Sequence, residues 1–162
     1  MTRLVQLKGH AMELDRFDRQ LLALLQQNCR FSSEQLAERV GLSASAVQRR
    51  TKRLREQGII VAEVAMVDPN QLPHLTFLVS IELERDNYPA LEQFKQWIKH
   101  EAAVQQVFYV TGDVDLVAVV TATDTRDYDN FSERLMVANP CVRRMNSQLV
   151  LDIPKQGLYW PV

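Results

Sequence analysis

The sequence predicts an α+β protein built from two modules, and three observations lead to this prediction. A chain of 162 residues suits one large domain or two small ones. Its charge is divided, because residues 1–58 carry 11 Lys or Arg against 6 Asp or Glu, whereas residues 59–162 carry 8 against 14. Helical periodicity fills the basic part, and strands alternate with helices in the acidic part. The division indicates two modules, the first with a polyanionic partner.

The composition excludes several classes of protein. With 46% hydrophobic and 24% charged residues, the chain can bury a core. The longest apolar run, Leu116–Val120, is too short to span a membrane, and the first residues contain no secretory signal. Cys29 and Cys141 show neither a metal-ligand spacing nor a disulfide framework. We therefore expect a cytoplasmic protein that is not an enzyme and has no metal, cofactor or membrane partner.

Two helices are predicted at the start of the basic part. Apolar residues recur at helical spacing across Asp15–Asn28. Ser32, with Gln35 three residues later, has the pattern of a capping box and should begin a second helix. Gly41 should end that helix with a positive φ. Residues 1–12 lie outside the pattern and are predicted to be an extension, either a disordered tail or a segment ahead of a natural start at Met12.

The third helix, which Ser43 can cap and Gly58 should end, contains five cations in the seven residues Arg49–Arg55. Its buried face is predicted to hold Val47, Thr51 and Leu54. A solvated surface is the usual explanation for such a run of charge. Here, however, a short helix precedes it, with Ala37 four residues before Gly41, which is the arrangement of a helix-turn-helix.

A helix-turn-helix places its second helix in the major groove of double-stranded DNA, with the N-terminal part of that helix near base edges. Gln suits adenine and Arg suits guanine, whereas Lys52 and Arg53 are expected on phosphates. The predicted DNA-binding residues are therefore Ser43, Ser45, Gln48, Arg49, Arg50, Lys52 and Arg53.

The next segment, "IIVAEVAMVD", is rich in β-branched residues and predicts a strand or short hairpin that would form a wing. Pro69 and Pro73 then mark a linker. The predicted boundaries are a winged helix-turn-helix over residues 13–62 and a connecting strand and linker over residues 63–75.

The acidic part alternates strands and helices in the order β-α-β-β-α-β, which is the order of a ferredoxin-like domain. We predict this domain over residues 76–155 and a tail over residues 156–162. Its strands are "TFLVSIELE", "VQQVFYV", "DLVAVVTAT" and "VRRMNSQLVLDI", and its helices run from Pro89 to about His100 and from about Thr125 to Ala138.

The third of these strands is apolar on both faces, with Val117 and Val119 on one face and Leu116, Ala118 and Val120 on the other. Two helices cover only one face of a four-stranded sheet, so the other face would be an unusually large exposed apolar patch. Burial against a second subunit explains this pattern, and a two-fold dimer also suits a palindromic DNA site. We therefore expect a homodimer.

Three motifs together resemble the Lrp/AsnC (leucine-responsive/asparagine-responsive, feast/famine) family of transcriptional regulators. They are "LDRFDRQLL", the stretch "VGLSASAVQRRTKRLREQGII" and the turn "GDVD", and the resemblance covers about residues 13–155. It implies a winged helix, an effector-sensing ferredoxin-like domain, and transcriptional control by amino acids in the prokaryotic nucleoid. It also implies dimers that assemble further, often into octamers. Many members have Pro and Cys where this chain has Ala44 and Val47, which puts the operator sequence in doubt.

The resemblance places the effector at a subunit interface near the turn "TGDVD". Carried over, the predicted effector-binding residues are Thr111, Gly112, Asp113, Val114, Asp115 and Leu116. A glycine lets backbone N–H groups approach a ligand carboxylate, and an aspartate can pair with an ammonium group. The alternative is that Gly-Asp is ordinary hairpin-turn chemistry.

Two functions remain open: a transcriptional regulator that responds to an amino acid or related metabolite, and an architectural protein that wraps or bridges DNA without a sensed ligand.

Overall fold

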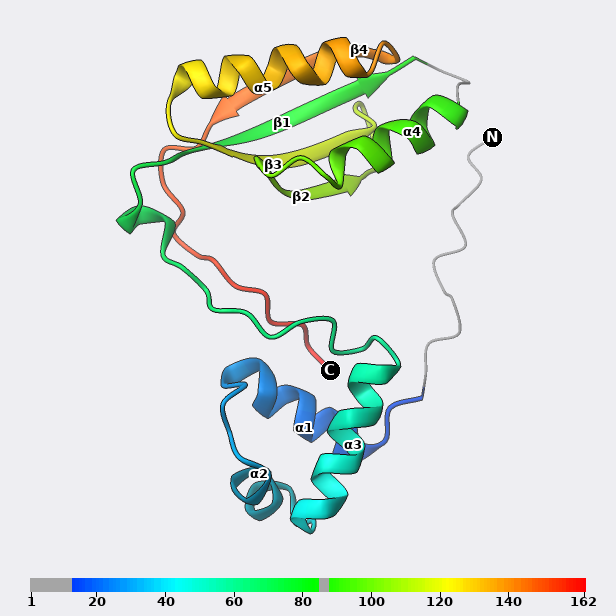
Figure 1. Cartoon of the computed structure of the whole chain (residues 1–162), viewed down its shortest axis with the longest axis vertical. Coiled ribbons are helices and arrows are strands. Elements are labelled where there is room, and N and C mark those ends of the chain that lie inside the picture. Colours follow the sequence, from blue (N-terminus) through cyan, green and yellow to red (C-terminus); the bar gives the residue numbers. More distant parts are fainter. Residues whose placement is uncertain (1–12, 85–87) are drawn as a thin grey trace. The chain divides into compact units, whose positions relative to one another are not determined.

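The computed structural model describes residues 13–84 and 88–162, which form two units (Figure 1). Among the described residues, one unit contains residues 13–66 together with Gln156–Val162, and the other spans Val67–Lys155. The predicted extension over residues 1–12 lies outside the described residues.

The first unit contains α1 (Arg16–Gln27), α2 (Ser33–Val40) and α3 (Ala44–Glu56). Capping boxes begin two of the helices, formed by the pair Asp15 and Asp18 at α1 and by the pair Ser32 and Gln35 at α2. Gly41 ends α2 with a φ of 71°, a left-handed conformation in which a side chain would be strained. The three predicted helices and the turn between α2 and α3 are therefore confirmed.

The core of this unit shows why α2 and α3 cross where they do. Val47 is buried against Leu21, Leu36 and Val40, and the small Ala37 lies in the same cluster. Burial of apolar side chains from all three helices stabilises the unit, at roughly 25 cal/mol for each Å² removed from water.

The predicted wing is wrong for this chain. Residues 59–68 contain no strand. Instead, the N–H groups of Ile59 and Ile60 both donate to the carbonyl of Leu54, at 2.9 and 3.1 Å, so the chain folds back onto the end of α3. Val61 beyond them is 88% exposed. A strand needs a hydrogen-bonded neighbour, and no described segment is paired with this one.

The last residues of the chain belong to the first unit. The side-chain amide of Gln26 in α1 donates to the carbonyl of Trp160 at 3.0 Å and accepts from its N–H at 2.7 Å. The amide thus pairs with the peptide backbone through both of its polar atoms. This contact holds the tail against α1.

A short 3₁₀ helix, η1 (Pro69–Gln71), leads into the second unit. Its sheet has the antiparallel order β2-β3-β1-β4, as the predicted ferredoxin-like topology requires. The elements along the chain are β1 (Leu75–Leu83), α4 (Tyr88–Ile98), β2 (Val104–Tyr109), β3 (Leu116–Ala122), α5 (Thr125–Ala138) and β4 (Val142–Leu149).

Both helices of this unit pack on one face of the sheet (Figure 1). Phe94 of α4 and Phe131 of α5 are fully buried there against alternate residues of β1 and β3. The opposite face, called the open face below, carries the intervening residues, because successive side chains of a strand point to opposite faces. Its apolar members are Leu78, Phe108, Val117 and Val119.

Candidate DNA interface and effector turn

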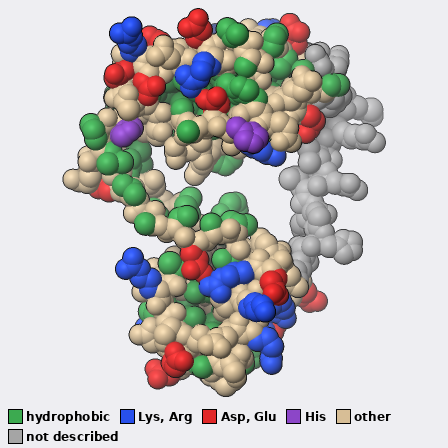
Figure 2. Space-filling view, in the orientation of Figure 1, with side chains coloured by type: hydrophobic (Ala, Val, Ile, Leu, Met, Phe, Trp, Pro, Cys, Tyr) green, Lys and Arg blue, Asp and Glu red, His purple; other side chains and the backbone are tan. Residues whose placement is uncertain are grey.

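Most of the polar residues predicted to contact DNA are displayed along α3. Ser43 caps the helix, since its Oγ accepts from the N–H of Ala46, and this Oγ also lies 3.2 Å from that of Ser45. Gln48, Arg49 and Lys52 are exposed over the next two turns. Figure 2 shows Lys and Arg side chains gathered on this unit, with Asp and Glu side chains among them. These exposed groups offer hydrogen bonds for bases and positive charge for phosphates.

Arg50 and Arg53 lie differently, because both are paired with carboxylates of α1. The Nη1 of Arg50 donates to Asp15 at 2.6 Å and to Asp18 at 2.9 Å, and the Nη2 of Arg53 donates to Asp18 at 2.6 Å. The helical projection had placed Arg53 on the outward face. In the structure, its guanidinium contacts Asp18 of α1.

These ion pairs also shift the pKa of Asp15 and that of Arg50. The N–H of Asp18 and then the guanidinium of Arg50 lower the pKa of Asp15, although burial opposes them. In return, hydrogen bonds to Asp15 and Asp18 raise the pKa of Arg50, again against burial. Both groups are therefore charged at neutral pH, and each neutralises the other.

A groove of about 370 Å³ borders the exposed face of α3. Gln48 and Lys52 form part of one wall, and Ser33, in the first turn of α2, forms part of another. The full lining is Leu25, Cys29, Phe31, Ser33, Leu36, Gln48, Thr51, Lys52 and Arg55, which includes two cations and no carboxylate. Arg55 is itself paired with Glu63, whereas Lys52 pairs only loosely with the exposed Glu56. The charge of Lys52 therefore favours an anionic partner on this side of α3.

The six predicted effector residues extend from the turn between β2 and β3 to Leu116, the first residue of β3. Thr111, Gly112 and Asp113 are exposed, and Gly112 has a φ of 125°, a conformation that favours glycine. The others become progressively less exposed, from the half-buried Val114 and Asp115 to the buried Leu116. Within one chain this turn is a surface feature, so a second molecule would be needed to enclose a ligand against it.

Asp115 has a structural contact within the chain. Its Oδ2 accepts the N–H of Leu83 at 2.7 Å, and its own N–H donates to the carbonyl of Ile81 at 3.0 Å. These bonds attach the turn to the end of β1. One carboxylate oxygen of Asp115 is thus already used, whereas Asp113 projects into solvent.

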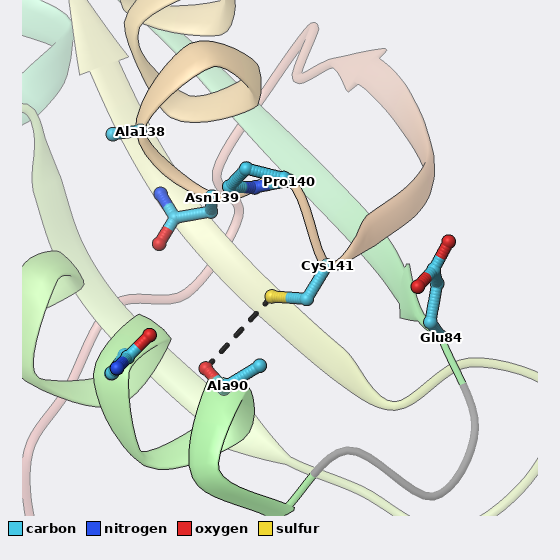
Figure 3. Close-up of a pocket in the computed structure, with 7 residues that line it drawn as sticks. Glu84, Ala90, Ala138, Asn139, Pro140 and Cys141 are labelled. Atoms are coloured by element: carbon cyan, nitrogen blue, oxygen red, sulfur yellow. Dashed lines mark hydrogen bonds between the residues drawn. The ribbon is translucent and has the colours of Figure 1, made fainter.

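A second hollow, of about 270 Å³, lies near the same end of β1, between the first part of α4 and the end of α5 (Figure 3). Cys141 is buried there with its Sγ 3.8 Å from the carbonyl oxygen of Ala90, and burial raises the pKa of the thiol. Asn139 is buried beside it, and its side-chain amide donates to Leu135. The raised pKa keeps the thiol protonated, and an uncharged thiol is a weak nucleophile.

The described part of the chain shows neither a membrane-spanning helix nor a cluster of metal ligands. No helix in the described part of the chain is long and apolar enough to cross a membrane. Residues 13–84 and 88–162 contain no group of three or more His, Cys, Asp or Glu side chains placed to hold a metal ion.

The sequence-based interpretation missed the partners of Arg50 and Arg53. From the sequence alone, Asp15 and Asp18 are explained locally, because the helix dipole favours anions in the first turn of a helix. Their spacing of three residues could have suggested more, because it puts both carboxylates on one face of α1. The pairing of Gln26 with Trp160, 134 residues away, left no signal in the sequence.

The two units match two families of domain. Residues 14–55 match the AsnC-type helix-turn-helix domain, and residues 76–159 match the Lrp/AsnC ligand binding domain. The first match contains α1, α2 and almost all of α3, and the second contains the sheet except for Leu75, together with the turn between β2 and β3.

Whole-chain relatives agree with these matches. An HTH-type transcriptional regulator of Sinorhizobium fredii is 40% identical over 157 residues, which are 96% of this chain and 93% of the relative. The leucine-responsive regulatory protein of Escherichia coli is 31% identical over 93% of this chain and 92% of its own length. A transcriptional regulator of Neisseria meningitidis, solved with L-Met, superposes with a TM-score of 0.80 at 28% identity, over 92% of this chain and 97% of that one. The protein therefore belongs to the Lrp/AsnC family of transcriptional regulators.

Proposed function

We propose that the protein regulates transcription by binding specific double-stranded DNA sites through the exposed side of α3, in response to an amino acid or a related metabolite. One observation supports the DNA-binding part above all others. Ser45, Gln48, Arg49 and Lys52 lie exposed along the second helix of a helix-turn-helix, and Gln48 and Lys52 line a groove whose lining contains no carboxylate. Such a helix can enter the major groove.

Salt dependence tests the phosphate contact assigned to Lys52. Each phosphate neutralised by a protein cation adds about 0.9 to the slope of log K against log salt concentration. Lys52→Ala should therefore weaken binding to all duplexes and reduce that slope by about one. The measurement is a titration of labelled duplex at several salt concentrations. Lys99→Ala, at an exposed lysine of the sheet unit, should leave the slope unchanged. An unchanged slope for Lys52→Ala would remove this residue from the DNA interface.

We place the effector at the turn of residues 111–116, enclosed by a second copy of the chain. The turn lies within the segment that matches the ligand binding domain. The Neisseria regulator, whose solved structure is a complex with L-Met, supports an amino acid as the class of effector. The exposed Asp113 could pair with a ligand ammonium, and the positive φ at Gly112 leaves its backbone open to a carboxylate.

Thermal stability measured against each of the twenty amino acids tests this assignment. A ligand at about 100 times its dissociation constant should raise the free energy of unfolding by about 2.7 kcal/mol. The rise should be selective for one or a few amino acids, and Asp113→Ala should remove it. Asp129→Ala, at an exposed carboxylate of α5, should preserve the rise. If no amino acid stabilised the protein, an architectural role without an amino-acid effector would become the better explanation.

We further propose that the chain acts as a homodimer joined through the open face of the sheet, and that dimers assemble into larger rings. Phe108 is 50% exposed on this face, with Leu78 on β1 and two valines on β3 beside it. Burial of this face stabilises a dimer through the hydrophobic effect. A dimer would also present two copies of α3 to one DNA molecule. Assembly of dimers into rings would bring the effector turns, residues 111–116, of different subunits close to one another.

A further inference from the structure

The five cations of α3 are not equivalent. Arg50 and Arg53 are three residues apart and so share one face of the helix, and the carboxylate of Asp18 binds both of them. Arg50 makes two further contacts with this part of the chain, an ion pair with Asp15 and a position 5.4 Å above the ring of Phe17. Arg49 lies only about 40° from Arg53 around the helix axis, because each residue of a helix turns by about 100°. Contacts, and not spacing, therefore separate Arg49 and Lys52 from the two arginines paired with Asp18. The fifth cation, Arg55, is paired with Glu63.

Burial distinguishes the two arginine pairs from surface ion pairs. Asp18 is 1% exposed, and its Oδ1 and Oδ2 accept from Arg50 and Arg53 respectively. The Nε of Arg53 is itself buried and without a hydrogen-bond partner, so the base of this guanidinium is enclosed in the unit. By contrast, Lys52 pairs only loosely with Glu56, at 3.7 Å, and both of these side chains are mostly in solvent.

Moving either arginine away from Asp18 to contact DNA would be energetically unfavourable. If Arg50 or Arg53 turned toward a phosphate, Asp18 would lose half of its compensation while still buried. The uncompensated carboxylate would then face a polyanion, and like charges repel most strongly where little water screens them. Both effects favour a state in which Arg50 and Arg53 remain paired with Asp15 and Asp18. Arg49 and Lys52 have no such constraint, since no described carboxylate holds either of them in a buried pair.

We propose that Arg50 and Arg53 are positioning residues, which orient α3 on α1 through Asp15 and Asp18, and that the cations of α3 that contact DNA are Arg49 and Lys52. This inference rests on the proposed DNA binding and revises the assignment of Arg50 and Arg53 made from the sequence. The buried cluster sets the rotation of α3 about its axis. That rotation decides where Gln48 and Arg49 meet the base edges.

The test measures salt slope and sequence discrimination for the same variants. The probes are a duplex selected from a randomised pool by the wild-type protein and a shuffled duplex of the same length. Arg53→Gln should leave the salt slope unchanged, because no phosphate contact is removed. It should lower the affinity ratio between the two duplexes by roughly fivefold or more, as the loss of a base contact does. Arg53→Lys keeps the charge within reach of Asp18 and should restore part of the ratio. Lys52→Gln should instead reduce the slope by about one and leave the ratio nearly unchanged.

Each outcome separates the alternatives. A slope reduced by about one in Arg53→Gln would show that Arg53 contacts phosphate, and would overturn the proposal. Slope and ratio both at wild-type values in a folded Arg53→Gln protein would show that the cluster serves only stability, and would also overturn it. If Arg53→Gln does not fold, the same two quantities are measured for Arg53→Lys. The affinity ratio between the two duplexes should then be lowered and the salt slope unchanged. A wild-type protein that selects no duplex would refute the DNA-binding proposal itself, which the other outcomes leave intact.

Discussion

If the proposed homodimer forms through the open face, Val119→Asp should separate it into folded monomers. Val119 lies on β3 in the open face, in register with Leu78 of β1 and Gln106 of β2. In a two-fold dimer formed through this face, Val119→Asp would bury two carboxylates, one from each copy, beside the apolar side chains of Leu78 and Val117. Like charges brought together in an interface disfavour association by several kcal/mol, so the dimer should weaken by roughly a thousandfold or more. Sedimentation equilibrium over a range of protein concentrations measures this change.

A matched substitution separates the loss of the interface from the addition of charge. Val137 is 75% exposed on α5, which packs on the other face of the sheet. Val137→Asp adds the same carboxylate to the same unit and should leave the dimer intact. If Val119→Asp remained dimeric at the wild-type concentration dependence, the open face could not be the main contact between subunits.

The helices of the first unit were predictable because their signals are local. Asp15 and Ser32 accept backbone N–H groups of the next turn, and this chemistry depends only on residues three positions away. Gly41 ends α2 because a left-handed backbone favours a residue without a side chain. Such signals can be read from a few neighbouring residues, because they do not depend on the rest of the chain.

The sheet was predictable for a related reason. Strict alternation places Phe77, Val79 and Ile81 on one face of β1, and all three are buried under the helices. The irregular pairing of β2 was not predictable, because the register shifts between Val104 and Gln106. A bulge of this kind depends on the partner strand, and the periodicity of one strand alone does not reveal it.

The predictions that were wrong, and those that stay untested, depend on contacts between residues far apart in the sequence or in different subunits. A helical projection gives the direction of each side chain about its own axis, but it does not say which helix lies alongside. Arg53 pairs with a carboxylate 35 residues earlier in the chain, so the projection could not distinguish it from Lys52. The predicted wing was wrong for the same reason, because the sequence around Val64 has strand-forming residues but no described segment pairs with it. The effector turn remains a proposal, since a single chain leaves Asp113 open to solvent.

Removing the charge of Asp18 should destabilise the helix-turn-helix unit more than any other single carboxylate-to-amide change in that unit. Asp18→Asn keeps the shape of the side chain but leaves Arg50 and Arg53 without their shared counter-charge. Breaking a buried ion pair by removing one partner typically lowers the free energy of unfolding by about 3–5 kcal/mol. We expect about 3 kcal/mol, the lower end, because the side chains of Arg50 and Arg53 are 22% and 43% exposed and water can solvate them in part. Native-state hydrogen exchange of the α1 and α3 amides measures this loss, with α5 amides of the other unit as an internal reference.

The control for this experiment is Glu56→Gln, which makes the same chemical change at an exposed pair. Its partner Lys52 lies 3.7 Å away with 76% of its side chain in solvent, and such pairs contribute roughly 0.5 kcal/mol or less. The two variants should therefore differ by a factor of about 100 in the equilibrium constant for opening of α1 and α3, since 1.4 kcal/mol is tenfold. If Asp18→Asn destabilised the unit no more than Glu56→Gln, the four charges of the cluster would behave as solvated surface groups. Arg50 and Arg53 would then be as free to reach DNA as Lys52 is, and the positioning role assigned to them would lose its physical basis.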